Sequence, residues 1–234
     1  MTLGRLDKRL VEEEQEIIYY KRLLRRNPDK ALLWDFLAEA YYKMAEYDEA
    51  IQCWHKYLEK KLMDDHKILV KIAQAYEAKG EVEFAFHYYL QALKDHPEDT
   101  HLLGKFGEMA YETKNYYDAL EAFQKLLKLG QKNEVILHNL GLTHYHLGHH
   151  KKALDYLQES LEINEDGADT WYTLAIIHAE NYLIDDALIA LEKAIMLNED
   201  LKEKAKNDPA FQCITHLSIF ELLTQSKVVE EEEG

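Results

Sequence analysis

The chain has 234 residues, of which 47% are hydrophobic and 31% are charged, and 28 Lys and Arg against 44 Asp and Glu give a formal net charge of -16. Such an acidic chain is repelled by phosphate backbones and by anionic membrane surfaces, so we expect no nucleic acid partner. The sequence has no run of about 18 apolar residues, so we expect a soluble protein without membrane insertion.

The amino terminus and the cysteines indicate the compartment. The first residues, Met1-Thr-Leu-Gly-Arg-Leu-Asp-Lys, become charged at once and lack an apolar signal segment with a small-residue cleavage site. The two cysteines, Cys53 and Cys213, lie toward opposite ends of the chain, where a shared disulfide is hard to arrange. We therefore expect a cytoplasmic protein.

Residues 1–30 predict one helix that precedes a repeat array. When the register of the repeats described next is continued backwards, Tyr20 and Leu23 lie at the packing positions of a second repeat helix, and Pro28 lies where a repeat closes. Glu16 stands at the position of a recurring small residue of the pattern, which suits a helix without a partner on that side. We expect an amino-terminal capping helix that corresponds to half a repeat.

The next part of the chain carries small residues at a nearly constant interval. Five alanines recur at a spacing of about 34 residues, which is the length of one helix-turn-helix unit of a solenoid. Twelve residues before each alanine lies another small residue, and two small residues at this separation allow two antiparallel helices to approach closely. The pairs are Ala38 with Ala50, Ala73 with Ala85, Gly107 with Ala119, Gly141 with Ala153 and Ala175 with Ala187.

Large apolar residues accompany these small ones and complete a family resemblance. They recur one and four places before the first small residue, as Leu37 and Trp34 do in the first repeat, which puts them on one helical face. The pattern resembles the tetratricopeptide repeat, whose signature includes Trp or Leu, Gly or Ala, Tyr, Ala and a closing Pro in each repeat. Tyr41 and Pro97 match two of these positions.

The resemblance implies an all-α fold. We expect a right-handed α-solenoid of five helical hairpins, with the amino-terminal half-repeat helix at one end and a carboxyl-terminal capping helix at the other. The five repeats are expected at residues 31–65, 66–99, 100–133, 134–167 and 168–200.

The repeat register fails after Asp200. Asp208 and Pro209 would break a first helix in its middle, so we expect a new helix to start at Pro209 with Asp208 as its cap. Residues 201–225 would then form capping helices, with a docking helix for a partner as the alternative, and residues 226–234 an acidic disordered tail. The apolar stripe that covers the last hairpin is expected to comprise Phe211, Ile214, Leu217 and Phe220.

By the same resemblance, the first helices of successive hairpins line a concave groove that holds a peptide or a helix of a partner protein. The amino-terminal half of this groove is expected to be mixed and rich in carboxylates, and the carboxyl-terminal half aromatic and aliphatic, with Tyr145 and Tyr172 as anchors. The candidate groove residues are Glu39, Lys43, Lys71, Gln74, Gly104, Glu108, Tyr111, His138, Asn139, Leu142, Tyr145, Tyr172 and Ile176.

Two further clusters have competing interpretations. Five histidines crowd the fourth repeat, but at helical spacing they face different directions, so we expect no metal site. A basic cluster at the end of the first helix meets the helix dipole favourably, and an anionic partner site is the alternative. The histidines are His138, His144, His146, His149 and His150, and the basic residues are Lys21, Arg22, Arg25 and Arg26.

The sequence indicates a binding protein rather than an enzyme. It has no glycine-rich phosphate loop, nucleophile elbow or carboxylate pair of controlled separation, and we expect neither catalysis nor a cofactor. The resulting hypothesis is a scaffold or adaptor that binds a partner protein in the groove. The alternatives are a self-assembling scaffold, in which a terminal helix of a neighbouring copy occupies the groove of a homo-oligomer, and a chaperone for secreted proteins.

Overall fold

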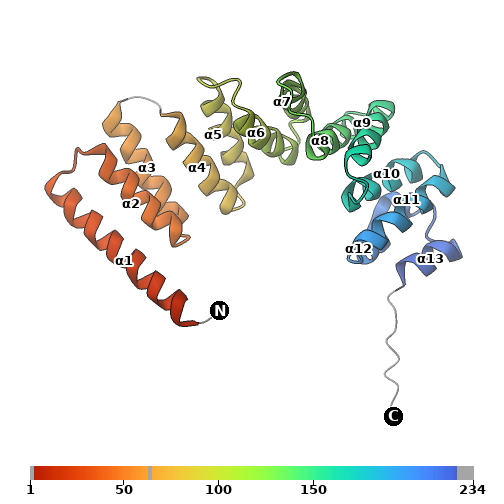
Figure 1. The fold of residues 1–234 in the computed structure, drawn as a ribbon, viewed down its shortest axis with the longest axis horizontal. Helices are drawn as coiled ribbons and strands as arrows, with labels where there is room; N and C mark the ends of the chain where they lie inside the picture. The colour runs from red at the N-terminus through yellow and green to blue at the C-terminus, as the bar shows by residue number, and fades with distance from the viewer. Residues whose placement is uncertain (1–2, 63–64, 226–234) are drawn as a thin grey trace, which may run out of the picture. The chain divides into compact units, whose positions relative to one another are not determined.

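The computed structural model describes residues 3–62 and 65–225, with side chains from residue 13 onward, and this part of the chain is all-helical without strands (Figure 1). The expected all-α fold is therefore confirmed. The acidic tail expected at residues 226–234 lies outside the described residues. The helices are α1 Leu3–Arg26, α2 Ala31–Lys43, α3 Tyr47–Lys61, α4 His66–Ala78, α5 Val82–Leu93, α6 Thr100–Glu112, α7 Tyr116–Lys128, α8 Glu134–His146, α9 His150–Ile163, α10 Ala168–Glu180, α11 Ile184–Leu197, α12 Leu201–Asn207, the 3-10 helix η1 Pro209–Phe211 and α13 Ser218–Thr224.

The chain divides into two compact units, Met1–Ala122 and Phe123–Gly234. In unit 1, α2 packs on α3 and α4 packs on α5 as hairpins, while α1 packs on α2. The small residues at these crossings, such as Ala38 and Ala50, are completely buried. Large apolar side chains around them fill the core of each hairpin. The small residues of the repeat therefore lie where the two helices cross, and the large residues fill the space around the crossing.

Polar caps start several of the helices. The side chain of Asp65 accepts a hydrogen bond from the backbone N–H of Lys67 at the start of α4. Asp99 accepts from His101 and Leu102 at the start of α6, and Asn133 caps α8 in the same manner. Each cap satisfies backbone donors that have no partner inside the helix, which stabilises the helix by about 1 kcal/mol.

Unit 2 repeats the hairpin with α8 on α9 and α10 on α11. Gly141 of α8 shows why the first small position is restricted. A Cβ at this residue would lie 2.6 Å from Cγ of Leu157 on α9, and both residues are buried. The two helices can therefore approach this closely only because residue 141 has no side chain.

All five hairpin turns use the same backbone geometry. The second residue after the first helix has a positive φ in every case, and the next backbone N–H donates to the carbonyl oxygen five residues earlier, as Glu46 does to Tyr41 at 3.0 Å and Asn115 to Ala110 at 2.8 Å. This 6→1 bond is that of a Schellman turn, which favours glycine. The positive-φ residues are Ala45, Gly80, Lys114, Gly148 and Tyr182, so only two of five are glycines.

After α12 the structure differs from the expectation. Asp208 does cap the segment that begins at Pro209, by accepting from the N–H of Ala210, but only the short helix η1 forms there. The hydroxyl of Thr215 donates to the carbonyl of Gln212, and the chain becomes extended at Leu217 before α13 begins. The expectation of one helix from Pro209 was wrong, because the local hydrogen bonds of turns replace those of a continuous helix.

The apolar stripe of this segment nevertheless reaches the core of unit 2. Phe211, Ile214 and Phe220 are at most 3% exposed and belong to the same cluster as the buried residues of α10 and α11, whereas Leu217 is only partly buried. The role of residues 201–225 as a cap remains a proposal. No helix in the described part of the chain is both long and apolar enough to cross a membrane.

We predict that Lys114→Gly stabilises unit 1 by about 1 kcal/mol, because a lysine in the left-handed conformation carries a Cβ clash that glycine lacks. Gly80→Ala provides the opposite change at the equivalent turn and should destabilise by a similar amount, since its φ is +75° although no atom lies within 4 Å of the place that a methyl group would take. Urea titrations followed by circular dichroism measure both. Equal midpoints for the three proteins would contradict the role of the turn.

Candidate functional site

The first helices of the unit 1 hairpins are joined by a recurring ion-pair arrangement. The ammonium of Lys71 on α4 lies 2.8 Å from Oδ1 of Asp35 and 2.7 Å from Oε1 of Glu39, both on α2. One repeat later, Lys105 on α6 lies 2.8 Å from Oε1 of Glu77 on α4. The two lysines occupy the same position of successive repeats, so the second and third repeats both use this position to bind the first helix of the preceding repeat.

The carboxylates of these ion pairs also contact the second helices of the hairpins. Asp35 accepts a hydrogen bond of 2.9 Å from the indole N–H of Trp54. Burial opposes the charge of Lys71, but its hydrogen bonds to Asp35 and Glu39 outweigh that effect and raise the pKa of Lys71. Partly exposed pairs of this kind contribute about 0 to 1 kcal/mol each, so their main consequence is to orient neighbouring helices.

We call the exposed side of α2, α4 and α6 the first-helix face of unit 1. Five of the groove residues expected from the sequence lie on it: Glu39, Lys71, Gln74, Gly104 and Glu108. Glu39 and Lys71 contact each other, and Glu108 lies 3.3 Å from Lys105. The two lysines of these ion pairs are shared by four carboxylates, those of Asp35, Glu39, Glu77 and Glu108, so a ligand would meet a polar surface with an excess of negative charge.

Two other expected groove residues of unit 1 have different neighbours. Lys43 forms a 3.3 Å ion pair with Glu16 of α1, and both side chains are about half exposed. The ring of Tyr111 meets that of Tyr116 edge to face at 5.7 Å, and burial raises the pKa of Tyr111 to about 12. Lys43 thus joins α1 to α2, and Tyr111 is a neutral aromatic group at the end of α6.

Gly104 occupies an open position in the interior of α6. No atom lies within 4 Å of the place where a Cβ would stand, and its φ is not in the positive range. Neither packing nor backbone conformation therefore requires a glycine here, in contrast to Gly141. Glycine inside a helix costs about 0.5 to 1 kcal/mol relative to alanine, so Gly104 leaves a notch on the first-helix face at a cost in stability.

In unit 2 the expected groove residues on α8 and α10 are held by hydrogen bonds. Nδ1 of His138 lies 2.9 Å from Oγ1 of Thr170, and the hydroxyl of Tyr145 donates to Oε2 of Glu180 at 2.8 Å. The backbone oxygen of Asn139 accepts a 2.6 Å hydrogen bond from the hydroxyl of Thr143. Leu142 and Ile176 are partly buried. The structure thus places these five residues on two helices of one unit.

Tyr172 does not offer a surface to a ligand, which corrects the expectation that it is an anchor. It is 2% exposed, its hydroxyl donates to Oδ2 of Asp208 at 3.0 Å, and its ring meets Phe211 edge to face at 5.7 Å. The ammonium of Lys204 lies 4.4 Å from the centre of the ring. The carboxyl-terminal segment therefore covers the position that a ligand would use.

We predict that Tyr172→Ala destabilises unit 2 by about 3 to 5 kcal/mol, the range for truncating a buried aromatic side chain. Tyr172→Phe should cost about 1 kcal/mol, because it keeps the ring and loses only the hydrogen bond to Asp208. Thermal unfolding followed by circular dichroism gives both values. Wild-type stability of Tyr172→Ala would show that the ring is not part of the core.

Two of the histidines in the fourth repeat meet, contrary to the expectation that all of them face different directions. Nδ1 of His144 lies 3.2 Å from Nδ1 of His149, because the Schellman turn folds residue 149 back over the end of α8. His144 also stacks on Tyr156 at 5.4 Å, and its Nε2 is buried without a hydrogen-bond partner. Among the described residues, no three potential ligands of a metal ion lie together.

His144 should make the stability of unit 2 depend on pH. Burial, followed by the charges of Lys152 and His149, lowers the pKa of His144 from 6.5, so folding favours the neutral ring. The stability that the neutral ring provides is complete above pH 6.5, and it is lost as the pH falls below that value toward the lowered pKa of the folded state.

We therefore predict that His144→Phe, which keeps a ring against Tyr156, unfolds at a higher temperature than the wild type and loses less stability between about pH 8 and about pH 5.5. The gain at the higher pH should be about 1 kcal/mol, because the unpaired Nε2 is removed. His216→Phe, at an exposed site, is the matched control. A pH dependence that His144→Phe leaves unchanged would contradict this role of the ring.

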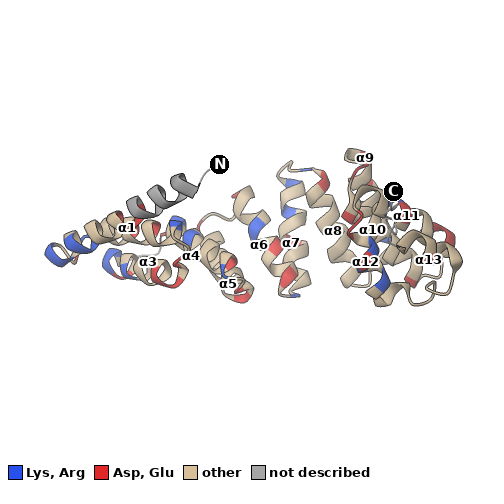
Figure 2. Ribbon diagram, turned by 90° about the horizontal axis from the view of Figure 1, so that it is seen from below, with Lys and Arg blue, Asp and Glu red and all other residues tan. Residues whose placement is uncertain are grey.

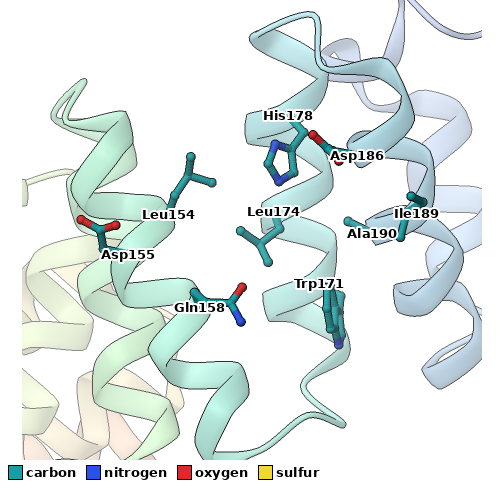
Figure 3. A pocket seen from close by; sticks show the side chains of 9 residues that line it. All are labelled: Leu154, Asp155, Gln158, Trp171, Leu174, His178, Asp186, Ile189 and Ala190. Carbon is teal, nitrogen blue, oxygen red and sulfur yellow. The ribbon is translucent and has the colours of Figure 1, made fainter.

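A hollow between α9, α10 and α11 was not foreseen from the sequence. Trp171, Leu174 and His178 of α10 form its floor, and Leu154 of α9 and Ile189 of α11 flank them (Figure 3). Its volume is about 320 Å³. The indole N–H of Trp171 donates to the carbonyl of Glu165 at 2.9 Å. The sequence feature that could have indicated this hollow is the tryptophan that recurs at the same position of two repeats, as Trp34 and Trp171.

Comparisons with known proteins identify the repeat. Family models described as "Tetratricopeptide repeat" match residues 98–166 and 33–62. No curated protein matches the chain. The likeness to solved structures is one of backbone rather than of sequence, and it shows the fold alone.

Three of these structures illustrate the likeness. A structure of MamA is 17% identical with a TM-score of 0.62 and covers 71% of this chain and 97% of its own. MamA 41-end from Desulfovibrio magneticus RS-1 is 17% identical with a TM-score of 0.63, covering 77% and 98%. YrrB, described as "a TPR protein with an unusual peptide-binding site", is 20% identical with a TM-score of 0.65, covering 77% and 93%.

Proposed function

Because the chain belongs to the tetratricopeptide repeat family, we propose that it is a non-enzymatic scaffold that binds an extended or helical segment of a partner protein on the first-helix face of unit 1. Proteins of this kind offer a preformed surface, so the ligand alone is ordered on binding. The peptide-binding site named in the description of YrrB supports a peptide as the ligand.

The open notch at Gly104 is the observation that carries this proposal. The helix would be more stable with alanine at this position, and no neighbouring atom prevents it. A side chain of a ligand that enters the notch would contact the backbone of α6 directly. The ion pairs of Lys71 and Lys105 on either side keep α2, α4 and α6 in register, so the notch is part of a braced surface.

The chemistry of the face indicates the kind of ligand. Glu39 and Glu108 are each 38 to 40% exposed and engaged with a lysine, and Gln74 adds an amide between them. Because four carboxylates share two lysines on this face, it suits a segment that combines polar groups with one small apolar side chain for the notch, rather than an acidic one. A cytoplasmic location belongs to the same proposal, and the two free cysteines, Cys53 and Cys213, support it.

We predict that Gly104→Ala increases the free energy of unfolding by about 0.5 to 1 kcal/mol, whereas Gly104→Leu leaves the fold intact and fills the notch. The three proteins are immobilised and incubated with a lysate of the source organism, and the retained proteins are quantified by mass spectrometry. A partner of the notch should be retained by the wild type and lost with Gly104→Leu.

Matched controls separate this face from other surfaces. Leucine at another glycine, Gly130, would not be a suitable control, because the φ of Gly130 is +81° and a side chain would strain the backbone there. The control is therefore Lys132→Leu, at an exposed site of unit 2. If every retained protein binds the wild type and Gly104→Leu equally, the first-helix face is not the site. Circular dichroism of Gly104→Leu shows whether its fold is unchanged.

A further inference from the structure

A second hollow lies in unit 1, between α1, α2 and α3, on residues that the first-helix face does not use. Its volume is about 910 Å³, larger than that of the hollow in unit 2. Leu24, Trp34, Leu37 and Tyr41 contribute its apolar lining. The indole N–H of Trp34 donates to the carbonyl of Pro28 at 3.0 Å, so the polar edge of the ring is satisfied and its apolar surface is left for the hollow.

Three cations line the same hollow, Lys21 and Arg25 on α1 and Lys56 on α3, against one carboxylate, that of Glu49 on α3. Figure 2 shows Lys and Arg, in blue, at the carboxyl-terminal end of α1 and in α3. In the part of the chain that the structure describes, Arg25 forms no ion pair, and Lys21 lies over the ring of Tyr41 at 5.2 Å. Lys56 pairs with Glu59 at 2.8 Å, but both are more than half exposed, so the pair can exchange partners.

The equivalent hollow in unit 2 shows that two of these cations, Lys21 and Arg25, are particular to unit 1, whereas Lys56 corresponds to Lys193, which lies 4.4 Å from the centre of the Trp171 ring. The two hollows are lined by equivalent repeat positions, because Trp34 and Leu37 correspond to Trp171 and Leu174 in the repeat register. At the positions of Lys21 and Arg25, unit 2 has Gln158 and Glu162. Its hollow is lined by the carboxylates of Asp155 and Asp186, of which Asp186 has a counterpart in unit 1, Glu49. The packing of the repeat therefore does not require Lys21 and Arg25.

The occupant must combine apolar and acidic groups, and one segment of this chain does so. Residues 226–234 read Ser-Lys-Val-Val-Glu-Glu-Glu-Glu-Gly, with two valines directly before the longest run of like charge in the sequence. We propose that the hollow of unit 1 binds this acidic segment of a second copy of the chain. Val228 and Val229 would contact the apolar lining, and the glutamates would contact Lys21 and Arg25.

Spacing and charge support this pairing. Lys21 and Arg25 are one helical turn apart, which is about 6 Å along α1. In an extended segment, side chains on the same side recur every two residues, about 6.6 Å apart, so two of the four glutamates can face the two cations at once. The whole chain carries a net charge of -16, whereas the hollow has three cations against one carboxylate, so it attracts a polyglutamate segment that most of the chain repels.

The test uses a fluorescein-labelled peptide of residues 225–234 and the full-length variant in which Glu230 to Glu233 are replaced by Gln, so that its own terminus does not compete. Fluorescence anisotropy should show saturable binding that weakens as salt rises from about 50 to about 300 mM. Lys21→Glu with Arg25→Glu should weaken binding about tenfold or more. Lys151→Glu with Lys152→Glu, exposed residues of unit 2, makes the same charge change and should leave binding nearly unchanged.

Cys53 provides a readout inside the hollow. It is 6% exposed and lines the site, and burial raises the pKa of its thiol to about 11, so it alkylates slowly in a Cys213→Ser background. Saturating peptide should slow the alkylation of Cys53 by N-ethylmaleimide further. Absence of peptide binding, an equal loss in both double variants, or no protection of Cys53 would each overturn the proposal.

A charge exchange tests the second copy. The mass of the wild type in sedimentation should rise between about 1 and about 100 µM, and Lys21→Glu with Arg25→Glu should abolish this rise. A mixture of that variant with a chain in which Glu230 to Glu233 are replaced by Lys should associate again. A monomer at all concentrations would overturn the proposal even if the peptide binds. The partner lost with Gly104→Leu is measured independently, so this inference and the proposed function can fail separately.

Discussion

The close approach of the two helices in each hairpin is the constraint on which the rest of the structure depends. It requires a small residue on both helices, and these residues, Ala38 and Ala50 in the first hairpin, are completely buried. Gly141 shows the limit of this requirement, since even a methyl group would overlap Leu157. The large apolar residues around these crossings then supply the burial that stabilises each hairpin, about 25 cal/mol for each Å² of apolar surface removed from water.

Once the hairpin is specified by these buried positions, other positions of the same repeat are free to differ, and the candidate sites use them. The fifth position is Asp35, Val70, Gly104, His138 and Tyr172 in successive repeats. Asp35 accepts hydrogen bonds, Gly104 leaves a notch, and Tyr172 is covered by the carboxyl-terminal segment. One backbone position thus serves three physical purposes, so function has to be inferred from individual side chains and not from the fold.

The fold could be predicted from the sequence because its signal is periodic, whereas the contacts of the sites depend on elements that lack a period. The sequence pattern indicated an all-helical repeat protein, and the structure confirmed it. The burial of Tyr172 could not be foreseen, because it depends on Asp208 and Phe211, which lie beyond the last repeat. The contact of His144 with His149 depends on the Schellman turn at Gly148, whose 6→1 hydrogen bond returns residue 149 to the end of α8, and helical spacing alone does not give that direction.

In unit 1 the two proposed sites meet at one helix. Asp35 and Glu39 of α2 belong to the first-helix face, whereas Trp34 and Tyr41 of the same helix line the hollow. Between them, Ala38 is fixed in the core of the hairpin and leaves α2 little freedom to shift. Binding at sites on a rigid element is additive unless one ligand displaces that element. A scaffold built in this way can hold a partner on one side of α2 and a second copy of itself on the other without either weakening the other's affinity.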